Sequence, residues 1–476
     1  MLSLAAPRVS AVASLLLLIA ATAPAAEWWP RFRGPDGSGI AANGNFPAHF
    51  GFNSNLVWKI AVPPGGSSPC LWESNLFLTA FNDGKLETHC VDRGDGRLRW
   101  KQSLDPGKIE CGARLGTPAD STPCTDGQRL YVYFAPFGLV CYDFAGKEIW
   151  RHPLPTPVTQ HGAATSPIVA GGRVLLACDQ DVGSFLLAVD ARDGRRLWRA
   201  ERAGYRRGFS TPLLWPPEKP DVAVLPGTLR LTAYALADGA ERWVVAGLPN
   251  EMVSSPAFGD GLIFVAGWTP GAGVSRLPQF DELLAQGDKN KDGILQRDEA
   301  PEGPARNHFP YIDADKDGAV TRAEWESLAK IFEQSKNALL AVRPGGFGDV
   351  TASQIVWTQT RGLPYVPSSL CYDGRVYLVK NGGMLSCFEA RTGRILFLEE
   401  RLGAIGDYYA SPVAAGGQVC VISQQGVAVV LRAGDTLEIL ARNPLGEQVL
   451  ATPAIVGNRL YVRTVKNLLV FAASVP

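Results

Sequence analysis

The stretch AVDARDGRRLW, residues 188–198, belongs to a series of similar stretches that determines the fold. Its copies are CVDRGDGRLRW at 90–100, CYDFAGKEIW at 141–150, AYALADGAERW at 233–243, CFEARTGRILF at 387–397 and VLRAGDTLEIL at 430–440. Each copy predicts a strand, a glycine-containing turn and a second strand that ends on a large apolar residue. Sheet faces stack about 10 Å apart, so we expect the terminal tryptophan to pack between neighbouring sheets.

A short Ser/Thr-Pro signal marks the start of each repeat. It occurs eight times, with Leu370 taken as the residue in the proline position of the sixth signal: Pro69, Pro123, Pro167, Pro212, Pro256, Leu370, Pro412 and Pro453. Most neighbouring signals are about 44 residues apart, a period that is typical of four-stranded propeller blades. Eight signals therefore predict eight blades.

The outer strand of the last blade comes from the other end of the chain. The final repeat ends before a fourth strand, whereas NLVWKIAV (55–62) carries the tryptophan of an outer strand with no strands before it. Pairing the two closes the ring and removes an open sheet edge. The sequence predicts an all-β, eight-bladed β-propeller with four-stranded blades over 55–476, closed by an N-terminal strand and preceded by an extension at 27–54.

The N-terminus has the features of a secretory signal peptide. Residues 1–26 contain one basic residue, Arg8, then an apolar run and small residues before Glu27. A buried strand or a membrane anchor is the alternative, but a spanning helix needs about 20 apolar residues and this run is shorter. No cysteine precedes Cys70 to carry a lipid. We expect a periplasmic or extracellular protein without a membrane span after cleavage.

Composition excludes some functions. Lys+Arg and Asp+Glu both number 46, so net charge indicates neither nucleic acid nor an anionic membrane as a partner. The nine cysteines fall mostly in apolar repeat positions, which favours buried thiols over disulfides. Cys111, on a long loop, is the exception whose pairing is left open. The absence of CxxC excludes a redox pair of that type. We expect a monomer.

Two segments, DKNKDGILQRDE (288–299) and DADKDGAVTRAE (313–324), resemble EF-hand calcium loops residue for residue. This spacing folds six or more oxygens around one hard cation. The predicted ligands are Asp288, Asn290, Asp292, Ile294 (carbonyl), Gln296 and Glu299 in the first loop, and Asp313, Asp315, Asp317, Ala319 (carbonyl), Thr321 and Glu324 in the second. An Asp/Gly-rich surface turn is the alternative, and two complete copies argue against it.

The calcium loops lie within an insertion in the fifth blade, over about 268–337. Strand counting places it between the second and third strands, on the face that carries the links between blades. Leu295 and Val320, at the eighth position of each loop, are expected to join in a short β-bridge. Pro301 and Pro310 leave room for only short helical turns between the loops. We expect the apolar stripe of the last helix to pack on the propeller.

The links between blades carry polar residues that could surround the mouth of the central channel. The candidate ligand-binding residues are Arg114, His161, Arg206, Tyr365 and Asp407, and Arg207, Glu251, Tyr408 and Glu447 lie in equivalent places. The alternative is that each is an ordinary solvated loop residue.

The repeat period, the D-x-x-x-G-x-x-x-W copies and WWPRFRGPDGSG at 28–39 resemble the quinoprotein-like (PQQ-like) β-propeller repeat family over nearly the whole chain. That family includes PQQ-dependent alcohol dehydrogenases and a non-enzymatic outer-membrane assembly propeller. The chain most resembles its secreted bacterial members of unassigned function. This chain lacks the neighbouring cysteines of those dehydrogenases and a matching Glu/Asn/Asp calcium set. PQQ is therefore not expected.

Two functions from different classes follow. The first is a secreted calcium-binding scaffold that holds a protein or glycan partner at the channel mouth, with no catalytic residue assigned. The alternative is a PQQ-dependent alcohol or sugar dehydrogenase. A fold of this kind hosts many functions, so the repeat alone does not decide between them. A hydrolase or lyase is disfavoured because no carboxylate pair or nucleophile motif is recognisable.

Overall fold

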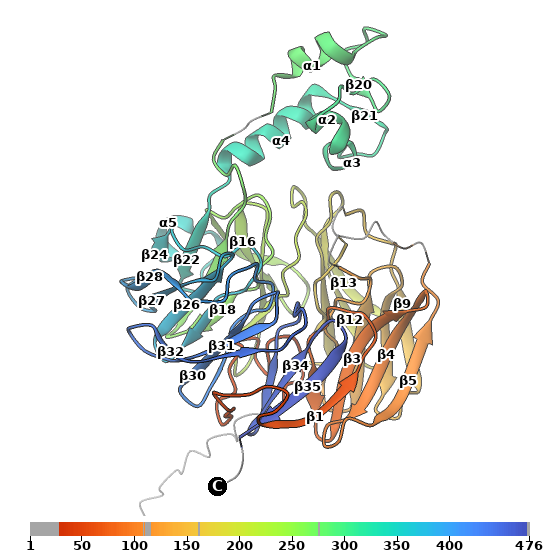
Figure 1. The fold of residues 1–476 in the computed structure, drawn as a ribbon. Coiled ribbons are helices and arrows are strands. Elements are labelled where there is room, and N and C mark those ends of the chain that lie inside the picture. The colour runs from red at the N-terminus through yellow and green to blue at the C-terminus, as the bar shows by residue number, and fades with distance from the viewer. Residues whose placement is uncertain (1–27, 108, 110–115, 160–161, 275–276, 474–476) are drawn as a thin grey trace, which may run out of the picture.

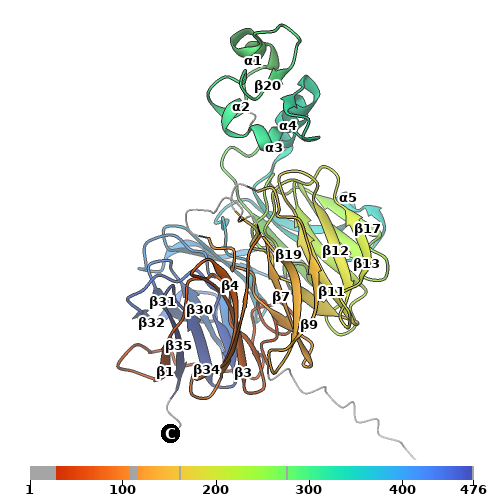
Figure 2. The ribbon, with the colours of Figure 1, turned by 90° about the vertical axis from the view of Figure 1, so that its right-hand side faces the viewer.

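The computed structural model describes residues 28–107, 109, 116–159, 162–274 and 277–473. A ring of four-stranded sheets forms the main body, and a small helical module stands on one face of the ring (Figure 1 and Figure 2). The predicted signal peptide, Cys111, Arg114 and His161 lie outside the described residues.

The first four blades follow one another along the chain, and each runs from a short inner strand to an outer strand. Blade 1 contains β2 (Cys70–Trp72), β3 (Asn75–Asn82), β4 (Lys85–Asp92) and β5 (Leu98–Leu104). Blade 2 contains β6 (Cys124–Thr125), β7 (Arg129–Phe134), β8 (Gly138–Asp143) and β9 (Glu148–Pro153). Blade 3 contains β10 (Ile168–Ala170), β11 (Arg173–Cys178), β12 (Phe185–Asp190) and β13 (Arg196–Glu201). Blade 4 contains β14 (Leu213–Trp215), β15 (Val222–Gly227), β16 (Arg230–Ala235) and β17 (Glu241–Ala246).

The next three blades repeat this order, with the insertion in the first of them. Blade 5 contains β18 (Ala257–Gly259), β19 (Leu262–Gly267), β22 (Ala338–Val342) and β24 (Ile355–Gln359). Between its last two strands, β23 (Gly348–Asp349) adds to β17 of blade 4 and α5 (Thr351–Gln354) follows. Blade 6 contains β25 (Leu370–Tyr372), β26 (Arg375–Lys380), β27 (Met384–Glu389) and β28 (Ile395–Arg401). Blade 7 contains β29 (Val413–Ala415), β30 (Gln418–Ile422), β31 (Val427–Arg432) and β32 (Glu438–Pro444).

The eighth blade joins the two ends of the propeller. It contains β33 (Ala454–Val456), β34 (Arg459–Arg463), β35 (Asn467–Ala472) and, as its outer strand, β1 (Leu56–Ala61). Strand β1 pairs antiparallel with β35, with Trp58 opposite Val470. The eight-bladed fold and its closure by an N-terminal strand are therefore confirmed.

The repeated glycine and tryptophan meet where two blades touch. The indole of Trp150, on β9, lies against Gly194 in the last hairpin turn of blade 3, and its Nε1 donates to the carbonyl of Ala191 at 3.0 Å. Gly194 has φ +73°, and a Cβ there would be 2.5 Å from the indole. The same pairing recurs at Trp58–Gly96, Trp100–Gly146, Trp198–Gly239 and Trp357–Gly393. The prediction that the tryptophans pack between blades is confirmed, and the glycine makes room for them.

Hydroxyl groups of the Ser/Thr-Pro signals form a chain of hydrogen bonds around the central axis. In each link, a backbone N–H of one blade donates to the hydroxyl of the next blade, as from Thr211 to Ser255 at 2.9 Å. The participants are Ser68, Thr122, Ser166, Thr211, Ser255, Ser368, Ser411 and Thr452. We call this the hydroxyl ring.

The sixth signal is displaced by one residue from the prediction. Ser369 occupies the proline position, because Leu370 already lies in β25, where it pairs with Tyr377. The hydroxyl of Ser368 accepts the hydrogen bond from the N–H of Ser255. This hydrogen bond between blades 5 and 6 shows which residue of the sixth signal is equivalent to the hydroxyl residue of the other signals. The sequence SSLC alone does not show it.

The segment before β1 crosses the face of the propeller opposite the helical module (Figure 1). Trp29 exchanges two backbone hydrogen bonds with Leu71, of 3.0 and 2.8 Å. Further along, the N–H of Ala41 donates to the carbonyl of Ala414. Residues 28–50, here called the base segment, therefore connect the first blade to the seventh beneath the channel.

The insertion forms a module with a hydrophobic core of its own. It contains α1 (Phe280–Gly287), β20 (Leu295–Gln296), α2 (Pro304–Asn307), α3 (Phe309–Ile312), β21 (Ala319–Val320) and α4 (Arg322–Gln334). The helices between the loops are short, as the prolines predict. Trp325 and Leu328 of α4 are buried against Phe280 and Phe309, not against the propeller. The prediction that this stripe packs on the propeller is wrong, because α1 and α3 cover it first.

Within the described residues, eight cysteines are free thiols and seven of them are buried. Burial raises the pKa of the Cys90 thiol to about 12, which keeps it protonated near neutral pH. No helix in the described part of the chain is both long and apolar enough to cross a membrane.

Candidate functional site

Both candidate calcium loops turn sharply at a glycine in the sixth position. Gly293 has φ +81° and Gly318 has φ +90°, values that a residue with a side chain adopts only at a cost. The N–H of Gly293 donates to the carboxylate of Asp288 at 3.0 Å, and that of Gly318 donates to Asp313 at 3.1 Å. The first residue of each loop thus holds the turn in the same way.

The second loop brings carboxylates together. Oxygens of Asp313, Asp315 and Asp317 lie within 4.8 Å of one another. Oδ1 of Asp313 is buried and has no hydrogen-bond partner. Burial, with Glu324 and Asp317 nearby, raises the pKa of Asp313 above its ordinary value. A hard cation at this point would pair the orphaned oxygen and neutralise the repulsion among the carboxylates, so these residues could bind a metal ion.

In the first loop, the candidate ligands form hydrogen bonds with one another. The carboxylate of Asp292 accepts from the N–H of Ile294 at 3.0 Å and from the side-chain amides of Asn290 and Gln296, both at 2.8 Å. Buried oxygens of Gln296 and Glu299 have no partner. To coordinate a cation through their oxygens, the side-chain amides of Asn290 and Gln296 would first have to break their hydrogen bonds to Asp292. The first loop is therefore the weaker candidate for a metal site.

The two loops are joined by a short antiparallel bridge. Leu295 of β20 lies opposite Val320 of β21, as predicted from their position in each loop. The last acid of the second loop also begins α4: Glu324 accepts from the N–H of Thr321 at 2.9 Å and from its hydroxyl at 2.8 Å. The two loops and the start of α4 are therefore in direct contact with one another.

Tyr311, in α3, connects the module to the channel mouth. Its ring lies 4.8 Å from the guanidinium carbon of Arg207 and 5.6 Å from that of Arg206, within the range of cation–π attraction. Burial raises the pKa of Tyr311 to about 12, so its hydroxyl stays protonated near neutral pH. Burial and the charge of Arg207 lower the pKa of His308, one turn earlier.

Asp181 holds both arginines in place. Arg207 donates from Nε and Nη2 to its two carboxylate oxygens, at 2.8 and 3.2 Å, and Arg206 donates to its backbone carbonyl at 3.0 Å. An oxygen of Glu251 lies 4.0 Å from Nη1 of Arg207. Burial raises the pKa of Glu251, and Arg207 opposes this effect. We call Asp181, Arg206, Arg207, Glu251 and Tyr311 the mouth cluster.

The predicted mouth residues are only partly brought together. Arg206 belongs to the mouth cluster. Burial is the main cause that raises the pKa of Tyr365, and the nearby charge of Glu251 adds to it. The ring of Tyr365 meets that of Trp268 edge-on, with 6.1 Å between the ring centroids. Asp407 is exposed, and its carbonyl accepts from the N–H of Gln424 in the neighbouring connection. Asp181 was not predicted, because it lies between two strands of one blade.

The module is attached to the propeller by a buried polar network at its stem. The side-chain oxygen of Asn250 accepts from the hydroxyls of Thr269 at 2.8 Å and Ser335 at 3.0 Å. The side-chain amide of Asn337 accepts from the N–H of Thr269 through Oδ1 and donates to the carbonyl of Thr269 through Nδ2. Both ends of the insertion are thereby tied to the link between blades 4 and 5. Isolated Ser, Thr and Asn residues gave no sequence signal for this contact.

Comparison with known proteins agrees with this architecture. A family profile described as outer membrane protein assembly factor BamB matches residues 82–251. BamB from Moraxella catarrhalis is similar in structure, with 12% sequence identity, a TM-score of 0.56, and coverage of 88% of this chain and 99% of that one. No curated protein matches the sequence.

Two quinoprotein enzymes are similar to the same degree. Quinohemoprotein alcohol dehydrogenase from Comamonas testosteroni is 14% identical, with a TM-score of 0.56, covering 95% of this chain and 82% of that one. A europium-containing methanol dehydrogenase is 11% identical, with a TM-score of 0.56 and coverage of 94% and 98%. At these identities the likeness concerns the fold alone. The profile match confirms the resemblance to the PQQ-like β-propeller repeat over residues 82–251, and the fold of the whole ring is similar to that of these solved structures.

Proposed function

We propose that this protein is a secreted, calcium-binding scaffold that holds a protein partner on the face formed by the channel mouth and the helical module. The propeller of BamB-like fold supports a scaffold role. The signal-peptide features of residues 1–26 support a periplasmic or extracellular location. We assign no catalytic residue.

The position of Tyr311 carries this proposal. Tyr311 lies in α3, whose last residue directly precedes Asp313, the first ligand of the second calcium loop. The same tyrosine is buried against Arg206 and Arg207 at the channel mouth. Ordering of the second loop by calcium would therefore hold α3, and with it the docking of the module on the mouth cluster.

The loop residues suit calcium because they offer oxygen ligands, and buried oxygens of Asp313, Gln296 and Glu299 have no hydrogen-bond partner. Asp313, Asp315, Asp317 and Glu324 would hold the ion in the second loop, and calcium would there neutralise charge and order the backbone. The other proposed ligands are the carbonyl of Ala319 and Thr321 in the second loop, and Asp288, Asn290, Asp292, Ile294, Gln296 and Glu299 in the first.

Apolar side chains on this face support a protein as the partner in preference to a glycan. Ile405 is 78% exposed and Trp268 is 41% exposed. Ile405 lies in the link between blades 6 and 7, and Trp268 at the stem of the module. Large exposed apolar residues near a polar rim are typical of protein interaction sites.

Calcium titration of the intact protein by calorimetry is expected to show two sites, the second loop being the tighter. The reason is that it offers four carboxylates and the first loop offers three. Dissociation constants of about 10⁻⁴ to 10⁻³ M are expected, as in extracellular modules. Asp313→Ala should remove the tighter site, and Asp288→Ala the weaker one.

Glu302→Gln is the matched control, because Glu302 lies between the loops with its side chain 92% exposed and is not a proposed ligand. It should leave both sites unchanged. Absence of calcium binding at millimolar concentrations, or equal loss in the control, would contradict the assignment of the loops.

Photo-crosslinking in the native cell compartment tests the partner face. A photoreactive residue at position 405 is expected to give a discrete adduct with one protein, weakened by a calcium chelator. The control is position 98, where Leu98 is 51% exposed on the outer strand of blade 1, away from the mouth. Adducts of equal yield at both positions, or none at position 405, would count against the partner face.

A further inference from the structure

Two buried arginines of the base segment carry guanidinium donors that have no hydrogen-bond partner. Arg31 is 6% exposed, and its guanidinium group forms no hydrogen bond with any described residue. Arg33 is 1% exposed, and its Nη2 donates to the carbonyls of Ser38 and Ser369, at 2.9 and 2.5 Å. Its Nε and Nη1 are buried without a partner, as is Nε of Arg31. A buried charged donor left unsatisfied is costly, so this arrangement points to a bound group.

The charges around these arginines do not balance. Asp36 is the carboxylate whose charge acts on both guanidinium groups. It is only half-buried, and one of its oxygens already accepts from the N–H of Ser38 at 2.9 Å. Burial lowers the pKa of Arg33 to about 10, so the group remains charged near neutral pH. Two guanidinium groups against one carboxylate leave about one positive charge in excess.

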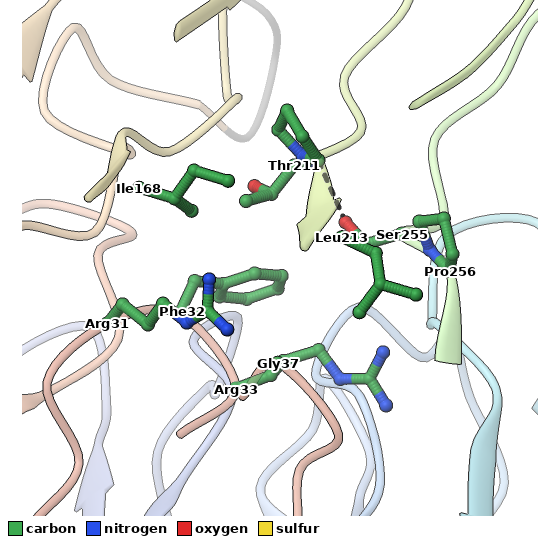
Figure 3. Close-up of a pocket in the computed structure, with 10 residues that line it drawn as sticks. Arg31, Phe32, Arg33, Gly37, Ile168, Thr211, Leu213, Ser255 and Pro256 are labelled. Carbon is green, nitrogen blue, oxygen red and sulfur yellow. Dashed lines mark hydrogen bonds between the residues drawn. The ribbon is translucent and has the colours of Figure 1, made fainter. Parts of the chain in front are cut away.

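A small cavity adjoins both arginines at the base of the central channel. Phe32 of the base segment and the inner ends of blades 3, 4 and 5 line it (Figure 3). Figure 3 shows Arg31 and Arg33 on one side of it, with Thr211 and Ser255 of the hydroxyl ring on the other. Its free volume is about 10 Å³, near the minimum for one water-sized particle, so a polyatomic anion such as phosphate, sulfate or an organic carboxylate does not fit.

The side chains around the cavity offer donors that have no acceptor. The hydroxyl of Thr211 accepts from the N–H of Ser166 at 3.1 Å, and that of Ser255 accepts from the N–H of Thr211 at 2.9 Å. Neither hydroxyl donates its hydrogen to another described residue. A water molecule at this point could accept bonds from these donors but would leave the excess positive charge in place. An anion accepts the same bonds and neutralises that charge.

We propose that this cavity binds one small monovalent anion, of the halide class, between Arg31, Arg33 and the hydroxyls of Thr211 and Ser255. The anion neutralises the excess charge of the base segment and gives the orphaned N–H groups an acceptor. It thereby anchors residues 28–50 across the channel, which closes the channel at this end.

Crystals grown in sodium bromide test this site directly. An anomalous difference peak from bromide is expected between the guanidinium groups of Arg31 and Arg33 in the wild-type protein. In solution, the Tm is expected to be about 1–3 °C higher in sodium chloride than in sodium gluconate of equal ionic strength, because only chloride fits the cavity and binds the folded state.

Arg31→Gln should abolish the difference in Tm between the two salts. Arg391→Gln should retain it, because Arg391 is a surface arginine with its side chain 78% exposed. Bromide density absent from the cavity, or equal wild-type Tm values in chloride and gluconate, would overturn the proposal. The bromide measurement needs no variant, so the proposal can be decided even if Arg31→Gln does not fold.

Discussion

Replacement of Asp179 by alanine is expected to lower the free energy of unfolding by about 3–5 kcal/mol. Asp179 accepts two hydrogen bonds from Arg202, at 2.6 and 2.8 Å, and the side chains are 4% and 0% exposed. Arg202 also lies 3.7 Å from the ring of Tyr205 and donates to the hydroxyl of Tyr234. Without Asp179 a buried guanidinium charge remains between blades 3 and 4 with no counter-charge, and the folded state bears that cost.

Urea unfolding followed by tryptophan fluorescence measures this change. Glu438→Ala is the matched control: Glu438 also pairs with an arginine, Arg432, at 2.9 Å, but both side chains are more than half exposed. That variant should lose no more than about 1 kcal/mol, since solvent screens exposed pairs. Equal losses in the two variants would show that burial does not determine the strength of the Asp179 pair.

Replacement of Gly194 by alanine is expected to lower the free energy of unfolding by about 2–5 kcal/mol. Part of this cost, about 1–2 kcal/mol, comes from holding alanine at φ +73°. The rest comes from overpacking, which costs about 1–3 kcal/mol, because the new Cβ would be 2.5 Å from Trp150. The contact lies between two blades, so blade packing itself is weakened.

Gly172 separates these two costs. Its φ of +74° nearly equals that of Gly194, but a Cβ there would meet no atom within 4 Å. Gly172→Ala should therefore show the backbone cost alone in the same urea experiment. The explanation fails if both variants lose the same stability, because the indole contact would then contribute nothing.

Much of the fold was predictable because its signals are local and repeated. The hairpin that ends at Trp198 and the Ser/Thr-Pro signal before it each describe a few adjacent residues, and repetition at a constant period reveals the number of blades. Closure by β1 was predictable as well, since Trp58 stands in an outer-strand pattern that lacks three preceding strands. The short bridge between Leu295 and Val320 follows from loop spacing alone.

Contacts between segments distant in sequence were not predictable in this way. The letters SSLC placed Leu370 one residue off, because the register is set by Ser255, a residue of the preceding blade. The apolar stripe of α4 was expected to pack on the propeller, but in the structure Phe280 and Phe309 of the module cover it. The sequence shows that a helix has an apolar face but does not show which element covers that face. The pairing of Asp181 with Arg207 joins the connection between β11 and β12 to the link between blades 3 and 4.

The number of blades, the strand that closes the ring and the place of the insertion with the candidate calcium loops could all be predicted from the sequence, because each of them depends on residue spacing along the chain. Which polar residues come into contact depends on how the blades and the module pack. The tertiary structure places Tyr311 on Arg206 and Arg207 and buries Arg31 and Arg33 beneath the hydroxyl ring. Burial and charge pairing depend on what several blades bring to one point, and no single stretch of sequence contains that information.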